Sequence, residues 1–93
     1  MATIVLPAAL RQYSKGVSSL EVEAADGAEL STVLDALAAA CPEVARRIRD
    51  ERGELRRFVN VYIDNEDARR MGGLAAPVPA RAEVLVLPSV AGG

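Results

Sequence analysis

The chain has 93 residues, a formal net charge of −2, 51% hydrophobic residues and only 3% aromatic ones, so it fits one small soluble domain whose core is built from Leu, Val, Ile and Ala. It contains no histidine, which excludes Ser-His-Asp and Cys-His catalysis and any His-containing metal site. Its single cysteine, Cys41, excludes an intrachain disulfide and a Cys-based zinc site.

A β-hairpin is predicted at the start of the sequence. Residues 3–6 alternate apolar and outward positions until Pro7 interrupts the ladder, as it would at an edge or a bulge. Lys15-Gly16 is a turn signal, and residues 19–24 then alternate with a period of two. The two strands are expected to pair with one face in solvent.

The hydrophobic period changes to that of a helix after Asp26-Gly27. Apolar residues recur at steps of three and four, and the alanines between them raise helix propensity, so an amphipathic helix is predicted over residues 30–41. Pro42 ends this helix and is accepted in the first turn of a short second helix over residues 43–49. Gly53 closes that segment.

The strongest strand pattern covers residues 58–63. Its alternation predicts one face made of Val59, Val61 and Ile63 and another made of Phe58, Asn60 and Tyr62. Residues 64–67 are predicted to form a turn, 68–70 a short strand and 71–73 a loop. A last, fully apolar strand is predicted over residues 83–87, ending at Pro88.

The order of these elements predicts an α+β domain. The first and last strands can lie side by side in parallel at the centre of a mixed sheet, with one main helix packed across it. This describes a β-grasp, or ubiquitin-like, fold over residues 1–88, followed by a flexible C-terminal tail over residues 89–93.

Membranes and nucleic acids are not expected partners. No segment approaches the roughly 20 apolar residues of a membrane helix. Residues 1–10 lack the basic start of a signal peptide, so a cytoplasmic location is expected. The scattered aromatic residues and the slightly acidic balance argue against nucleic-acid binding.

The sequence ends in Gly92-Gly93, preceded by the small residues Pro88-Ser89-Val90-Ala91. Five extended residues reach roughly 17 Å, enough to enter the active site of another protein. Without a Cβ, the glycines can pass a narrow channel and leave the terminal carboxylate open to attack. A free carboxylate is a poor acyl donor, so adenylation by ATP and displacement of AMP by a sulfur nucleophile would leave a thiocarboxylate on Gly93.

Four motifs carry a resemblance to a known family: Phe58-Val59-Asn60-Val61-Tyr62, Asn65-Glu66-Asp67, Gly72-Gly73-Leu74-Ala75 and Leu87-Pro88-Ser89-Val90-Ala91-Gly92-Gly93. Through these motifs the sequence resembles the ThiS and MoaD group of ubiquitin-like sulfur carriers over essentially its whole length, and most closely the CysO type. One departure is the stretch 79–83, Pro-Ala-Arg-Ala-Glu, where members often have an Asp-Gly-Asp-like turn.

The resemblance implies a set of partners. A ubiquitin-activating-type adenylating enzyme, similar to MoeB and ThiF, would use ATP to activate Gly93, and a sulfur-acceptor synthase would receive the sulfur. In the CysO type the acceptor is a pyridoxal-phosphate cysteine synthase acting on an O-phosphoserine-derived intermediate, and a metalloprotease then frees cysteine. Thiamine thiazole, molybdopterin and sulfur-containing secondary metabolites remain open as other end products.

Two other classes of function remain open beside the carrier. A ubiquitin-like modifier would use the same adenylation and end in isopeptide bonds to protein lysines. A plain β-grasp binding module would not need Gly92 and Gly93 at all. An enzyme is not expected, since the chain has no histidine and no clustered acid-base pair, and no bound cofactor or metal is expected either.

A docking face follows from the register of the last strand. If Val84 and Val86 point into the core, Leu85 and Leu87 lie on the outer face of the sheet. Phe58 and Tyr62 are expected close by. Exposed apolar residues grouped in this way often mark a partner site, so these four residues are predicted to dock the enzymes that receive the tail.

Three other features are given structural interpretations. Six arginines, Arg46, Arg47, Arg49, Arg52, Arg56 and Arg57, alternate with acidic residues. They are expected to form a self-compensating surface rather than a nucleic-acid site, with a docking patch for an acidic partner as an intermediate hypothesis. Cys41 is expected to be a small apolar residue on the buried face of the helix rather than a sulfur carrier. Gly72-Gly73 is expected to be a backbone turn rather than a phosphate-binding loop.

Overall fold

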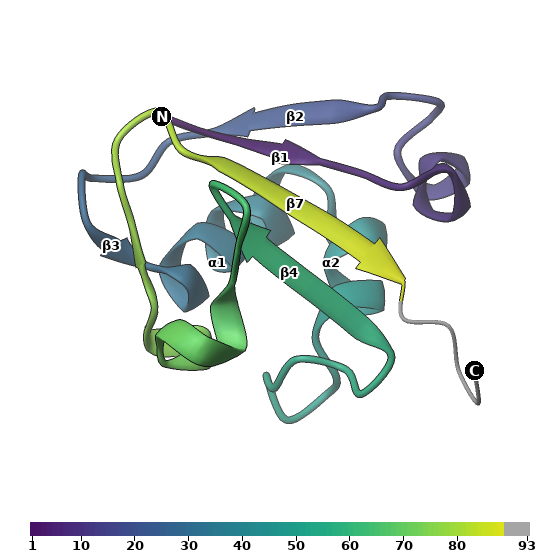
Figure 1. Cartoon of the computed structure of the whole chain (residues 1–93). Helices are drawn as coiled ribbons and strands as arrows, with labels where there is room; N and C mark the ends of the chain where they lie inside the picture. The colour runs from purple at the N-terminus through teal and green to yellow at the C-terminus, as the bar shows by residue number, and fades with distance from the viewer. Residues whose placement is uncertain (89–93) are drawn as a thin grey trace.

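A five-stranded mixed sheet, covered on one face by two helices, is the framework of the molecule (Figure 1). The structure is a computed structural model that describes residues 1–88. The strand order is β2-β1-β7-β4-β5. The bounds are Ala2–Val5 for β1, Ser19–Val22 for β2, Val59–Ile63 for β4, Glu66–Asp67 for β5 and Glu83–Pro88 for β7.

The parallel pair at the centre of the sheet confirms the predicted topology. β1 pairs antiparallel with β2, as the hairpin pattern predicts, and runs parallel to β7. β7 pairs antiparallel with β4 over five residue pairs, from Val59↔Pro88 to Ile63↔Val84. First and last strands lying in parallel between antiparallel neighbours give the β-grasp arrangement.

The two helices pack their apolar residues against one face of the sheet (Figure 1). α1 spans Leu30–Ala40 and α2 spans Pro42–Ile48, each within one residue of its predicted bounds. α2 accepts Pro42 in its first turn, where a proline costs no hydrogen bond. The fully buried large side chains are aliphatic: Ile4, Leu6, Leu30, Leu34, Leu37, Ile48, Ile63, Val33, Val44, Val61, Val78 and Val84.

The predicted role of Pro7 as an edge or bulge position is wrong. β1 ends at Val5 and is flanked by β2 and β7, so it is not an edge strand. Pro7 lies at the N-cap of a 3₁₀ helix, η1 (Ala8–Tyr13), in the segment that joins the hairpin strands. Because this helix buries none of its residues, it leaves no amphipathic pattern in the sequence.

The short strand predicted over residues 68–70 is also wrong. These residues belong to a 3₁₀ helix, η2 (Ala68–Met71), whose first turn is capped by the Asp67 carboxylate accepting the Arg69 N–H at 2.9 Å. The short strand is β5, within the predicted turn. Asp64 and Asn65, both at positive φ, turn the chain in two residues, so pairing resumes at once.

Three further elements lack any counterpart in the predictions. β3 (Ala28–Glu29) and β6 (Pro77–Val78) pair antiparallel in a separate two-stranded sheet, and η3 (Gly73–Ala75) follows η2. Two-residue strands are too short to show a period.

The stretch 79–83, where the sequence departs from the family that it resembles, forms a closed turn. The Ala82 N–H donates to the Pro79 carbonyl at 3.1 Å, and Arg81 has a φ of 64°. Its neighbour Ala80 donates its N–H to the Asp26 carboxylate at 2.9 Å.

None of the helices in the described part of the chain is long and apolar enough to cross a membrane.

Candidate functional site

The candidate site begins where β7 ends. Pro88 is exposed and pairs with Val59 at the last position of the β4–β7 ladder. The predicted tail residues Ser89, Val90, Ala91, Gly92 and Gly93 lie outside the residues that the structure describes. The described part of the site is therefore the surface around the point from which the tail continues.

Three of the predicted docking residues, Tyr62, Leu85 and Leu87, lie on the outer face of the sheet, and Phe58 lies in the turn directly before β4. Val84 and Val86 are 0% and 1% exposed in the core, so Leu85 and Leu87 face outward, as the predicted register requires. Leu85 lies opposite Tyr62 across the ladder, and Leu87 lies opposite Asn60. We call Phe58, Tyr62, Leu85 and Leu87 the outer apolar patch.

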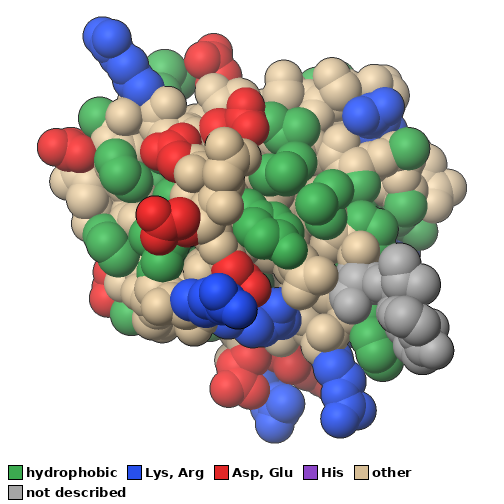
Figure 2. All heavy atoms as spheres, viewed as in Figure 1, with side chains coloured by type: hydrophobic (Ala, Val, Ile, Leu, Met, Phe, Trp, Pro, Cys, Tyr) green, Lys and Arg blue, Asp and Glu red, His purple; other side chains and the backbone are tan. Residues whose placement is uncertain are grey.

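This patch is open to solvent. Phe58 is 53% exposed and Leu87 is 38% exposed, which is unusual for large apolar side chains in a small domain. Figure 2 shows hydrophobic side chains gathered over β7 and β4. Val5 extends the patch onto β1, where it pairs with Leu85. The sequence analysis missed Val5, although its alternation with the buried Ile4 places it on the outer face.

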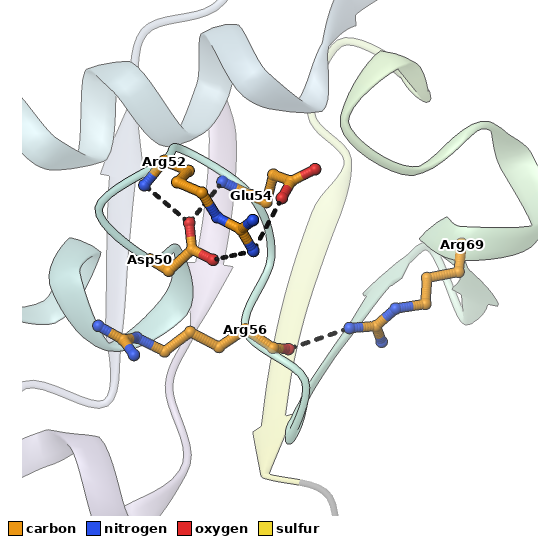
Figure 3. A network of polar contacts seen from close by, with 5 residues as sticks. All are labelled: Asp50, Arg52, Glu54, Arg56 and Arg69. Atoms are coloured by element: carbon orange, nitrogen blue, oxygen red, sulfur yellow. Dashed lines mark hydrogen bonds and ion pairs between the residues drawn. The ribbon is translucent and has the colours of Figure 1, made fainter.

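A folded loop between α2 and β4 forms the next part of the site (Figure 3). The Asp50 carboxylate accepts the N–H of Arg52 at 2.9 Å and the N–H of Glu54 at 3.1 Å. The hydrogen bond from Glu54 is the main cause that lowers the pKa of Asp50, and the nearby Arg52 guanidinium adds to it. Arg52 lies 3.5 Å from Asp50 and 3.3 Å from Glu54, so it forms an ion pair with each of them.

The arginine run is only partly self-compensating. Arg46 pairs with Glu43 at 3.0 Å, and Arg49 pairs with Asp35 at 2.8 Å. The guanidinium of Arg47 instead stacks over the ring of Tyr13, 4.3 Å from its centroid. Arg56 and Arg57 have no carboxylate oxygen within ion-pair distance among residues 1–88.

Arg69 joins this loop to η2. Its guanidinium donates to the Arg56 carbonyl at 3.1 Å (Figure 3). It also donates to the Asn60 side-chain oxygen at 3.1 Å. The Arg56 carbonyl also accepts the N–H of Val59 at 3.1 Å. Arg69 therefore holds the loop against the first residues of β4, beside the end of β7.

The remaining predicted features have structural roles. Cys41 is half-buried at the end of α1, packs against the core, and its thiol lies 3.5 Å from the Tyr13 carbonyl. Gly72 has a φ of +108° and joins η2 to η3, which confirms a backbone turn. Within residues 1–88, no cluster of three or more Asp, Glu or Cys residues is arranged to hold a metal ion.

Comparison with known proteins places these features in a family. The model of the ThiS family matches residues 4–93. The sequence is 38% identical over 93 residues to the sulfur carrier protein CysO of Mycobacterium tuberculosis, covering 98% of this chain and 97% of the relative.

Two solved structures extend the comparison. The crystal structure of the Amycolatopsis orientalis BexX/CysO complex has a chain that matches with a TM-score of 0.83 and 35% identity, covering 100% of both chains. The small archaeal modifier protein 1 of Haloferax volcanii matches with a TM-score of 0.81 and 28% identity, covering 96% of this chain and 97% of that one.

Proposed function

Because this chain belongs to the ThiS family, we propose that it is a sulfur carrier, and not an enzyme, whose Gly93 carboxylate is converted to a thiocarboxylate. The observation that carries the proposal is the nearly full-length match to a protein named as a sulfur carrier, on the same β-grasp framework. Such a carrier supplies the reacting atom, and its partners supply the catalysis.

The chemistry proceeds in two balanced steps. An oxygen of the Gly93 carboxylate attacks the α-phosphorus of ATP, so that an acyl-adenylate forms and pyrophosphate leaves. A sulfur nucleophile at the oxidation level of sulfide then attacks the carbonyl carbon. The bond to AMP breaks, and AMP leaves with the electron pair. The product is a thiocarboxylate, a better nucleophile than the carboxylate it replaces because sulfur is more polarisable. ATP is a substrate of the activating partner in this scheme.

Two kinds of partner are required. The first is an adenylating enzyme similar to MoeB and ThiF, which activates Gly93. The second is a sulfur-acceptor synthase, and the relation to CysO favours cysteine biosynthesis, with a metalloprotease that frees the product. The complex of BexX with CysO in Amycolatopsis orientalis supports a partner that binds the folded carrier. We assign the outer apolar patch to docking both kinds of enzyme.

The intact mass of the chain tests this proposal. The full-length protein is incubated with ATP, a candidate adenylating enzyme and a sulfide source. A variant that lacks Gly93 is treated in the same way. The expected result is a mass gain equal to the exchange of one oxygen for one sulfur, seen only with the full-length chain. A folded chain that gains no mass with several such enzymes would contradict the carrier proposal.

A protein modifier is the second candidate, because a small archaeal modifier protein matches this chain over nearly its whole length. A modifier would share the adenylation step and then form an amide bond with a lysine amine. The same incubation, supplemented with a cell extract, distinguishes the two. Higher-mass species that resist reduction and contain the Gly93 carbonyl would indicate a modifier rather than a carrier.

A further inference from the structure

Charged residues on the outer face of the sheet are distributed unevenly along β7. At the start of the strand, Glu83 lies beside Thr3, and Thr3 in turn lies opposite Glu21 on β2. The outer apolar patch occupies the middle and the end of the strand. Figure 2 shows several acidic side chains on the left of this face. The face is therefore acidic at the end that is farther from the tail.

Arginines occupy the opposite end. Val59 pairs with Pro88, so Arg57, two residues before Val59, lies at the end of the sheet from which the tail continues. Arg56 and Arg69 are fixed at the same place by the hydrogen bonds that the Arg56 carbonyl accepts from Val59 and Arg69. We call Arg56, Arg57 and Arg69 the basic rim.

The charge of this rim is not neutralised within residues 1–88. Both hydrogen bonds of the Arg69 guanidinium go to uncharged oxygens, those of Arg56 and Asn60. The Arg56 side chain donates to a third uncharged oxygen, the Arg46 carbonyl, at 2.8 Å. In contrast, each of the three paired arginines earlier in the run meets a carboxylate within 3.5 Å.

Two of the rim arginines line one cavity. Arg57 and Arg69 border a hollow of about 590 Å³ whose apolar lining is Leu55 and Leu74. Asp50, Glu54 and Arg52, which pairs with both carboxylates, also border it, so the three arginines and two carboxylates of its lining sum to a net charge of +1. The excess of positive charge suits a carboxylate side chain from a partner.

We propose that the basic rim binds acidic side chains around the opening through which the activating enzyme admits the tail. The inference rests on the proposed function and adds the orientation of the complex. The chain as a whole carries a net charge of −2. An acidic partner surface therefore attracts the rim and repels the end that carries Glu21 and Glu83, so the carrier approaches with its tail forward.

Charge reversal at the rim tests this inference. Arg57→Glu is suited, because Arg57 is exposed and makes no ion pair among residues 1–88. Arg81→Glu is the matched control, since it changes the net charge equally at an exposed site near the acidic end. The measurement is ATP–pyrophosphate exchange by a MoeB/ThiF-type adenylating enzyme as the carrier concentration is varied. Circular dichroism confirms that each variant is folded.

The expected result is that Arg57→Glu raises KM about tenfold at low salt, with kcat nearly unchanged, whereas Arg81→Glu does not raise it. The effect should shrink at about 0.5 M salt, where the Debye length is only a few Å. Arg57→Lys should recover most of the loss, since it restores the charge.

The outcomes separate the two proposals. If the wild-type chain supports exchange and Arg57→Glu has the same KM at low salt, the proposed role of the basic rim is wrong. The carrier function is not affected by that result. An equal effect of Arg81→Glu also overturns the rim, because net charge alone would then account for the change. A folded wild-type chain that supports no exchange with any such enzyme counts against the carrier function itself. The proposed role of the basic rim is then also rejected, because it depends on that function.

Discussion

Asp50 shows how one carboxylate shapes the loop that leads into β4. Its side chain accepts two backbone N–H groups, those of Arg52 and Glu54, and its own N–H donates to the Glu54 carbonyl at 2.8 Å. These bonds close the turn that ends at the isolated bridge between Arg49 and Leu55. Arg56 and Arg57 follow directly, so the turn helps to position the basic rim.

The stability of the fold in acid should depend on the ionisation of Asp50. The Glu54 hydrogen bond and Arg52 lower the folded-state pKa of Asp50 below 3.8, the value of a free Asp. Its charge therefore stabilises the fold above pH 3.8, and the contribution is lost as the pH falls through the folded pKa. Asp50→Asn cannot titrate, so the wild type should be more stable at neutral pH and lose this advantage in acid. Urea unfolding at several pH values measures it.

A control in the same loop separates this effect from a general change of charge. Glu51→Gln removes one negative charge at an exposed position that makes no ion pair within residues 1–88. The difference in the free energy of unfolding between the wild type and Glu51→Gln should not change comparably as the pH falls. A wild-type advantage over Asp50→Asn that stays constant from neutral to acid pH would show that the charge of Asp50 does not support the turn.

The arginines mark the limit of sequence reasoning at the residue scale. Their alternation with acidic residues predicted that all six would be compensated within the run, and this holds for Arg46 and Arg52. The partner of Arg49 is Asp35 on another helix, and Arg69 reaches back thirteen positions to Arg56. Pairs this distant in the sequence depend on the tertiary fold, so the sequence could not separate the paired arginines from the basic rim.

At the scale of elements, α1 shows where hydrophobic periodicity predicts well. The helix buries Leu30, Val33, Leu34 and Leu37, and its predicted bounds are within one residue of the observed ones. Elements that bury a continuous stripe or an alternating face leave a pattern, as α1 and β4 do. β3 and β6, with two residues each, are held by pairing with distant segments and leave none.

Truncation of the buried stripe of α1 should destabilise the whole domain. Leu37 is 0% exposed and packs in the single core cluster, so Leu37→Ala removes buried methyl groups and leaves a cavity. The expected loss is about 2–5 kcal/mol in the free energy of unfolding. Ala39→Ser, at an exposed position of the same helix, should change it by about 0.5 kcal/mol or less. Chemical denaturation measures both, and equal losses would contradict the packing of α1.

At the scale of the whole molecule, the two faces of the sheet differ in what they contact. The core lies between the helices and the inner face of the sheet, so the outer face is free to carry apolar residues that the fold does not need to bury. The outer apolar patch lies between the acidic start of β7 and the basic rim beside Pro88. Docking through this face would therefore bring Pro88, after which the tail continues, close to the partner.

A charge within the patch should weaken docking without unfolding the chain. Leu87→Asp introduces a carboxylate at a side chain that is 38% exposed, so little core packing is lost while an apolar contact with the partner is replaced by a desolvated charge. Val17→Asp is the matched control, since Val17 is 41% exposed and lies in the segment between η1 and β2. Affinity for the adenylating enzyme, measured by calorimetry, should fall about tenfold or more for Leu87→Asp and little for Val17→Asp. Full affinity in a folded Leu87→Asp chain would place the docking surface elsewhere, because a partner that covers this face could not accommodate the carboxylate without loss.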